Sequence, residues 1–180
     1  MTILGDKAQT MEEQQQDVLK FLPKIFGRDI RKIIMNRSYR NTMEIAEYAN
    51  KLTGIQDMEL FERHGAPVEE RMFAQQKEAL DEVIRRWEAK KADYETEVLI
   101  LFTEREAERA YLYIEEKLKS LDPDGEYQLN YMNRDSQSFK KGLTVTTFYL
   151  AKGLEFDQVF GVFAENADDG LIRPVSYTHL

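Results

Sequence analysis

Residues 143–163, LTVTTFYLAKGLEFDQVFGVF, decide the fold of this chain. The two ends of the stretch, 143–150 and 158–163, are rich in β-branched and aromatic residues, which is typical of buried strands. Between them lies 151–157 with Gly153, a residue that lets the backbone turn tightly or approach a ligand closely. The stretch therefore predicts a strand, a glycine turn, and then a second strand or a short helix.

Glu155 is a carboxylate between two apolar neighbours, Leu154 and Phe156. It is either the solvated side chain of an ordinary turn or an acidic group that the core presents to a ligand. The stretch by itself favours neither interpretation.

Composition narrows the class of protein. A chain of 180 residues is long enough for one domain of ordinary size, and 42% hydrophobic with 32% charged residues is typical of a globular protein. The formal net charge of -8 argues against a protein that binds nucleic acid over its whole surface, although a local basic strip remains compatible with it.

Several kinds of site are not expected. Cysteine is absent, which excludes disulfides and thiolate metal sites, and the two histidines, His64 and His179, lack the spacing of a zinc site. No apolar run is long enough for a transmembrane helix, and the N-terminus does not resemble a signal peptide. We therefore expect no metal bound by the protein alone, no membrane contact and a cytoplasmic location.

Strand and helix patterns alternate along the chain. Apolar residues at helical spacing predict helices over 11–26, 41–53, 75–93 and 104–120. The first of these is expected to break or kink at Pro23. Strands are expected over 30–35, 69–73, 97–102 and 127–132. This alternation predicts an α/β fold with a mostly parallel sheet and helices on both faces.

Three stretches together carry a resemblance. Residues 4–11, LGDKAQTM, 36–42, NRSYRNT, and 145–160, VTTFYLAKGLEFDQVF, resemble motifs III, IV and V of the superfamily 1 helicases, the UvrD, Rep and PcrA group, in the family's order. The wording YLAKG at 149–153 is closer to the HelD-type, DNA helicase IV-like branch. About one hundred residues separate motifs IV and V, which leaves no room for the large inserted domain of UvrD and Rep.

The resemblance implies that residues 1–175 form the second, C-terminal RecA-like motor domain, a three-layer α/β/α unit, cut from a longer chain. Ser176–Leu180 matches nothing in the family and is expected to be a non-native tail. The implied function is that of the C-terminal motor domain of an ATP-dependent DNA helicase or translocase.

The resemblance also assigns nucleotide-binding roles. Gln9 matches the γ-phosphate sensor, Tyr39 the residue that stacks on adenine, and Arg40 an arginine finger that reaches the γ-phosphate; Gly153 and Glu155 match the part of motif V beside the ribose. Arg40 and Gln9 would be the catalytic residues. Without the resemblance, Tyr39 is more simply a core residue and Arg40 a solvated one. We expect Gln9, Tyr39, Arg40 and Glu155 to lie at one edge of the sheet, at the carboxyl ends of the parallel strands.

Thr147 and Tyr149 match the part of motif V that contacts nucleic acid, here single-stranded or duplex DNA. Tyr149 stands where many relatives have histidine, and it would either stack on a base or pack in the sheet. After motif III, relatives carry an aromatic residue and an arginine, whereas this chain has Met11-Glu12-Glu13. An RNA polymerase-recycling motor of the HelD type is therefore an alternative to duplex unwinding.

Two motifs of the motor are absent from the sequence. It contains neither the phosphate-binding pattern Gly-x-x-x-x-Gly-Lys-Ser/Thr nor an Asp-Glu pair at the end of an apolar strand. ATP with Mg²⁺ would be bound mainly by a missing N-terminal RecA-like domain, and we expect the chain alone to be inactive. The rival hypothesis is a non-catalytic RecA-like module that binds a protein partner.

Overall fold

The computed structural model describes residues 18–27, 33, 37–38, 40–53, 59–60, 62–90, 92–121, 125–136, 140–165 and 171–178. The helices are α1 (Val18–Phe26), α2 (Met43–Thr53), α3 (Gln76–Lys90), α4 (Glu104–Leu121) and α5 (Phe148–Ala151). The strands are β1 (Arg37–Ser38), β2 (Glu59–Leu60), β3 (Glu69–Glu70), β4 (Thr96–Leu101), β5 (Leu129–Tyr131), β6 (Gly142–Thr147), β7 (Gln158–Glu165) and β8 (Leu171–Thr178).

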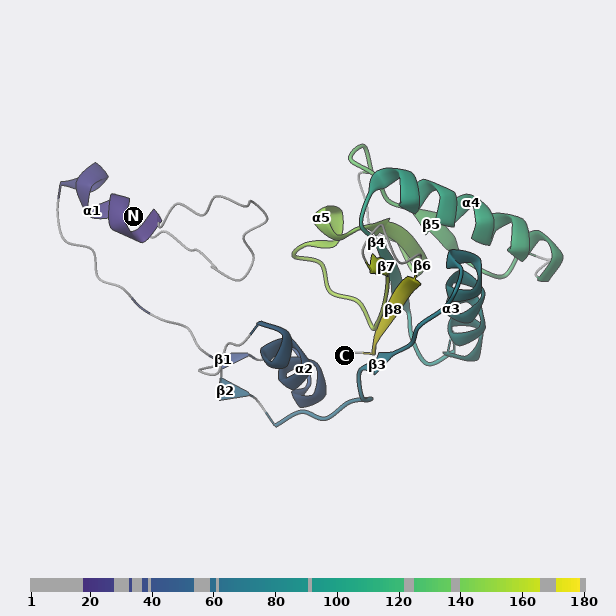
Figure 1. Cartoon of the computed structure of the whole chain (residues 1–180), viewed down its shortest axis with the longest axis horizontal. Coiled ribbons are helices and arrows are strands. Elements are labelled where there is room, and N and C mark those ends of the chain that lie inside the picture. Colours follow the sequence, from purple (N-terminus) through teal and green to yellow (C-terminus); the bar gives the residue numbers. More distant parts are fainter. Residues whose placement is uncertain are drawn as a thin grey trace.

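The main sheet has the order β3-β8-β7-β4-β6-β5 (Figure 1). Strands β5, β6, β4 and β7 pair in parallel, and β8 runs antiparallel to both of its neighbours. The protein thus has an α/β fold around a four-stranded parallel sheet, as the alternating pattern predicts, and it is consistent with the three-layer α/β/α fold of RecA-like domains. A separate parallel pair, β1 and β2, lies beside α2.

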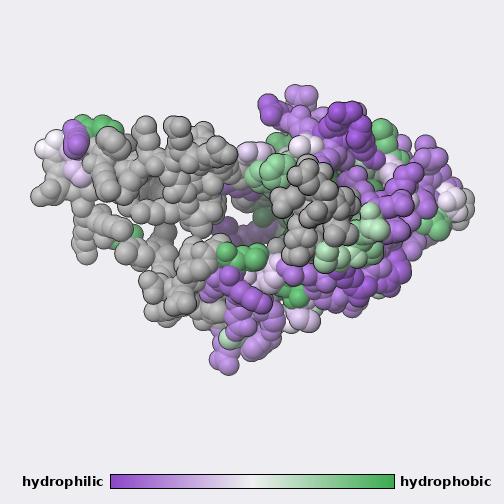
Figure 2. Space-filling model, viewed as in Figure 1, coloured by the Kyte–Doolittle hydropathy of each residue, from purple (hydrophilic) through white to green (hydrophobic). Residues whose placement is uncertain are grey.

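One face of the sheet carries the larger core. Helices α3 and α4 cover this face (Figure 1), and the predicted apolar stripe of α3 is buried throughout. Alternate strand residues such as Leu99 and Leu101 point toward these helices because side chains alternate across a strand. Trp87 is buried here, where its ring and the Tyr127 ring pack edge to face. The outer sides of α3 and α4 are mostly hydrophilic (Figure 2).

The opposite face has a smaller core that lies next to the motif V stretch. Val98 of β4 packs there with Ala151 of α5 and with Phe156 of the segment that follows α5. The 143–163 stretch therefore supplies both a central strand and part of the cover of its own sheet. This arrangement holds residues 148–157 against the strands.

Some element boundaries differ from the expected ones. Phe148–Leu150 continue into a helical turn rather than extending the strand, and α1 runs through Pro23 to Phe26. Ile33, expected in a buried strand, is exposed and outside any strand. These differences arise because burial and hydrogen bonding of the whole chain override local propensity.

The ends of two elements add detail. Leu52, near the end of α2, is exposed, whereas Ala46, earlier in the same helix, is buried. Ser176 pairs with Glu69 and with Phe160, and β8 continues to Thr178. His179 and Leu180 lie outside the described residues.

Candidate functional site

The turn after α5 depends on Gly153. Its φ of +83° lies in the left-handed region, which residues with a Cβ rarely adopt, and Leu154 N–H donates to the Ala151 carbonyl at 3.0 Å across the turn. A Cβ built on Gly153 would meet nothing within 4 Å. The predicted glycine turn is therefore confirmed, and the space beside it is open among the described residues.

The segment from Lys152 to Asp157 returns the chain to the amino-terminal end of β4. There, one carboxylate oxygen of Asp157, Oδ2, accepts hydrogen bonds from Glu95 N–H, Thr96 N–H and the Thr96 hydroxyl, at 2.9, 2.8 and 3.0 Å. Asp157 N–H in turn donates to the Thr96 carbonyl at 2.8 Å. With Phe156 buried in the small core, the two residues that follow Glu155 are held in place.

Glu155 and Arg40 meet in space although they are far apart in the sequence. Arg40 Nε lies 2.9 Å from Glu155 Oε1, with the two side chains 74% and 53% exposed. An exposed pair of this kind contributes only about 0–1 kcal/mol to stability. The fold therefore brings together two residues that were assigned to the nucleotide from separate motifs, and it leaves both accessible.

The position of Glu155 differs from the expected one. It does not lie at a strand end but on the segment that runs from α5, beyond the carboxyl end of β6, to Asp157 at the amino-terminal end of β4. The reason is that β7 is parallel to β6, so the chain must cross back over the sheet before β7 begins. Gln9 and Tyr39 lie outside the described residues.

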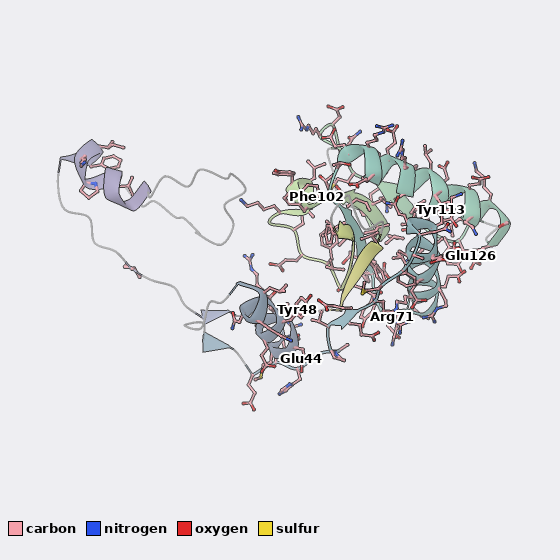
Figure 3. All side chains as sticks on the ribbon, viewed as in Figure 1. Glu44, Tyr48, Arg71, Phe102, Tyr113 and Glu126 are labelled. Carbon is pink, nitrogen blue, oxygen red and sulfur yellow. The ribbon has the colours of Figure 1, made fainter. Side chains whose placement is uncertain are left out.

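The carboxyl ends of β4 and β6 carry a row of aromatic rings. Phe102 follows β4 and lies 5.3 Å from the Phe148 ring, which is itself 4.0 Å from the Tyr149 ring, all between ring centroids. Phe102 and Tyr149 are 61% and 56% exposed, and Phe102 appears beside α5 in Figure 3. Thr147, the other expected nucleic-acid residue, is buried.

Phe102 was not singled out from the sequence, where it reads as the last residue of a strand. The residues after it contain the missed signal, because Thr103 and Glu106 form a capping box at the start of α4. Glu106 Oε2 accepts from Thr103 N–H at 2.8 Å, and Glu106 N–H donates to the Thr103 hydroxyl at 3.2 Å. A large apolar residue that stands between a buried strand and a helix cap is therefore expected at the edge of the sheet where that strand ends.

The same edge carries charge of both signs. Arg134, in the loop after β5, contacts Glu104 at the start of α4, with Arg134 Nε 2.9 Å from Glu104 Oε1. Both side chains are exposed, so the guanidinium remains accessible to an anion. This edge is thus an aromatic strip beside one ion pair rather than a wholly basic surface.

His64 forms a second exposed pair, with Glu44 of α2. Its Nδ1 lies 2.9 Å from Glu44 Oε1, and this hydrogen bond raises the pKa of His64 and lowers that of Glu44 to about 2. The other Glu44 oxygen accepts from Gly65 N–H. His64 therefore lies at the surface and joins the segment after β2 to α2.

Within the described part of the chain, no three His, Cys, Asp or Glu side chains gather into a cluster that could hold a metal ion. None of the helices described is both long and apolar enough to cross a bilayer. Comparison of the sequence with models of known protein families and with curated proteins finds no match.

Proposed function

We propose that the chain is the second motor domain of an ATP-driven helicase or translocase of superfamily 1, in which Arg40 and Glu155 complete an ATP site shared with a P-loop domain. The observation that carries this proposal is the contact between Arg40 and Glu155. The two residues come from stretches that resemble motifs IV and V, and a fold unrelated to that resemblance would have no reason to join them.

The chemistry of the pair suits a nucleotide. A guanidinium offers several N–H donors in a planar fork that matches phosphate oxygens, and a carboxylate accepts hydrogen bonds from ribose hydroxyls. Arg40 contacts Glu155 through Nε, and both side chains are exposed. The guanidinium can therefore release Glu155 and bind a phosphate when ATP binds. The open space beside Gly153 leaves room for a ligand to approach the backbone.

ATP with Mg²⁺ would supply the transferable phosphoryl group, held mainly by the P-loop domain. Phosphoryl transfer depends on positioning and on charge stabilisation, and Arg40 would stabilise the negative charge that develops on the γ-phosphate. Gln9 would sense that phosphate and Tyr39 would stack on the adenine, as the resemblance implies.

The aromatic strip at the carboxyl edge supports single-stranded nucleic acid as the second ligand. Exposed rings offer stacking faces for bases regardless of sequence, and Arg134 offers a charge to the backbone. Tyr149 belongs to the motif V resemblance, while Phe102 and Phe148 extend the same surface. DNA is the proposed polymer.

The test is ATP turnover by the complete motor, with this chain joined to its P-loop domain. Arg40→Ala should reduce turnover by roughly 10³–10⁵, the range for arginine fingers. Arg40→Lys should restore little of it, because an ammonium cannot form the planar fork. The melting temperature should stay within about 1 °C, since an exposed ion pair contributes little to stability.

Arg134→Ala is the matched control. Arg134 is also an exposed arginine whose Nε lies 2.9 Å from a glutamate, but its partner is Glu104 of α4 rather than Glu155. It should leave ATP turnover without nucleic acid unchanged. Normal turnover in Arg40→Ala, or an equal loss in both variants, would remove Arg40 from the proposed site.

A further inference from the structure

Glu97 and Gln158 are buried next to each other on β4 and β7. Their Cα atoms are register partners in the parallel pairing, and the residues are 1% and 4% exposed. Register partners on neighbouring strands point to the same face, here the face covered by α3 and α4. The two side chains have the same number of carbons, so their end groups reach the same depth.

Both side chains carry an oxygen with no hydrogen-bond partner. Among the described residues, the buried side-chain oxygens that lack one are Glu97 Oε1, Gln158 Oε1 and Thr144 Oγ1, and Thr144 lies on the opposite face of the sheet. An unpaired buried acceptor has lost its hydrogen bond to water without replacement, so two neighbouring ones call for a shared explanation. A proton on Glu97 supplies it, because a neutral carboxylic acid is a donor as well as an acceptor.

Among the described residues, the charged group that acts on Glu97 is Asp157, which is itself negative and therefore does not compensate a charge on Glu97. Several charged side chains of the surrounding elements are engaged elsewhere: Lys90 with Asp93, Lys117 with Asp81, Lys119 with Glu115, Lys141 with Glu95, and Glu88 with Tyr127. Burial, and to a smaller extent Asp157, raise the pKa of Glu97 from 4.5 to about 7.

We propose that Glu97 is a neutral acid in the folded chain and donates a hydrogen bond to Gln158 Oε1, which joins β4 to β7 in a pH-sensitive way. This hydrogen bond is present while the Glu97 carboxyl is protonated and is lost when the carboxyl ionises. Gln158 directly follows Asp157, whose hydrogen bonds anchor the segment that carries Glu155. Ionisation therefore loosens the end of that segment, whether or not the ATP site is as proposed.

The expected pH dependence follows from the two states of Glu97. The folded chain binds the proton more tightly than the unfolded chain, so stability falls as the pH rises from about 4.5 to about 7 and is constant above that. Glu97→Gln keeps a donor that can reach Gln158 at every pH. Glu97→Leu keeps the volume but leaves Gln158 Oε1 unpaired.

The experiment measures melting temperature from pH 5 to pH 8.5 for the whole chain and its variants. The wild type should lose about 5 °C relative to Glu97→Gln across this range. At pH 5.5 the wild type should melt close to Glu97→Gln and above Glu97→Leu. Glu95→Gln, two residues away but exposed and paired with Lys141, is the matched control and should keep the wild-type slope.

Titration of the Glu97 carboxyl by carbon NMR in the unmodified chain provides a readout that does not depend on how the variants fold. A midpoint near pH 7 is expected. A midpoint close to 4.5, a wild-type curve parallel to that of Glu97→Gln, or a Glu97→Leu variant as stable as Glu97→Gln at pH 5.5 would each overturn the proposal.

Discussion

Glu82 shows how much a single charged side chain can hold together when it is partly buried. It lies on α3 and accepts hydrogen bonds from Arg71, Arg85 and Arg86, with distances of 2.6–2.9 Å. Arg86 and Arg71 also reach Glu69 of β3, so the cluster joins the edge strand to the helix; Arg71 is labelled in Figure 3. The hydrogen bond from Arg85 is the largest cause that lowers the pKa of Glu82, to about 2.

Glu82→Gln should lower the free energy of unfolding by about 2 kcal/mol at pH 7, since hydrogen bonds to charged groups contribute about 1.5–3 kcal/mol. Because the folded pKa is depressed, this contribution is present above pH 4.5 and is lost as the pH falls toward 2. Urea unfolding at pH 7 and at pH 3 checks it. Glu78→Gln, an exposed change on the same helix, should have little effect at either pH; equal losses in the two variants would contradict the assignment.

At the scale of single elements, the start of β6 depends on a close approach of two backbones. Gly142 has a φ of +91°, and a Cβ placed on it would lie 2.1 Å from the Gln128 carbonyl oxygen. The next residue, Leu143, donates its N–H to that same oxygen at 2.9 Å. The contact sets how the chain enters β6, the strand that leads into α5.

Gly142→Ala should therefore destabilise the chain by about 3 kcal/mol or more, from the positive φ and from overlap with backbone that cannot move aside. Gly125→Ala is the matched control, because Gly125 has a φ of +74° but nothing within 4 Å of a Cβ. It should cost only about 1–2 kcal/mol. Denaturant titration compares the two, and a Gly142→Ala variant as stable as Gly125→Ala would show that the contact relaxes without cost.

Across the whole molecule, the two candidate surfaces are built from different elements. Glu155, which contacts Arg40, lies on the segment between α5 and β7, whereas Phe102, Phe148 and Tyr149 follow the carboxyl ends of β4 and β6. Under the proposed function, nucleotide and nucleic acid would therefore contact separate residues, with the 148–157 segment connecting them.

Because the two surfaces are separate, substitutions in the aromatic strip should weaken nucleic-acid binding and leave ATP turnover intact. In the complete motor, Tyr149→Ala and Phe102→Ala should each weaken binding of an oligo-dT strand by about 1–3 kcal/mol, the range for one base stacked on an aromatic side chain. ATP turnover measured without nucleic acid should not change. Leu112→Ala, an exposed apolar change on the outer side of α4, is the control and should leave both measurements unchanged. Loss of basal turnover in Tyr149→Ala would place Tyr149 with the nucleotide residues instead.

The periodicity of apolar residues in the sequence was sufficient to predict most of the helices and strands. The apolar stripes of α3 and α4 and the run that forms β4 are local patterns, and burial of one face follows directly from them. The glycine turn at Gly153 was likewise predictable, because the residue itself permits the conformation. The α/β class followed from the alternation of these patterns.

The tertiary structure decided what no local pattern encodes. The contact of Arg40 with Glu155, the row of rings that includes Phe102, and the pairing of Glu97 with Gln158 each join residues that are far apart in the chain. Each contact depends on strand order and on the path of the segment returning from β6 to β7. Sequence fixes side-chain chemistry and local geometry, whereas the distance between two groups depends on how the whole sheet is assembled.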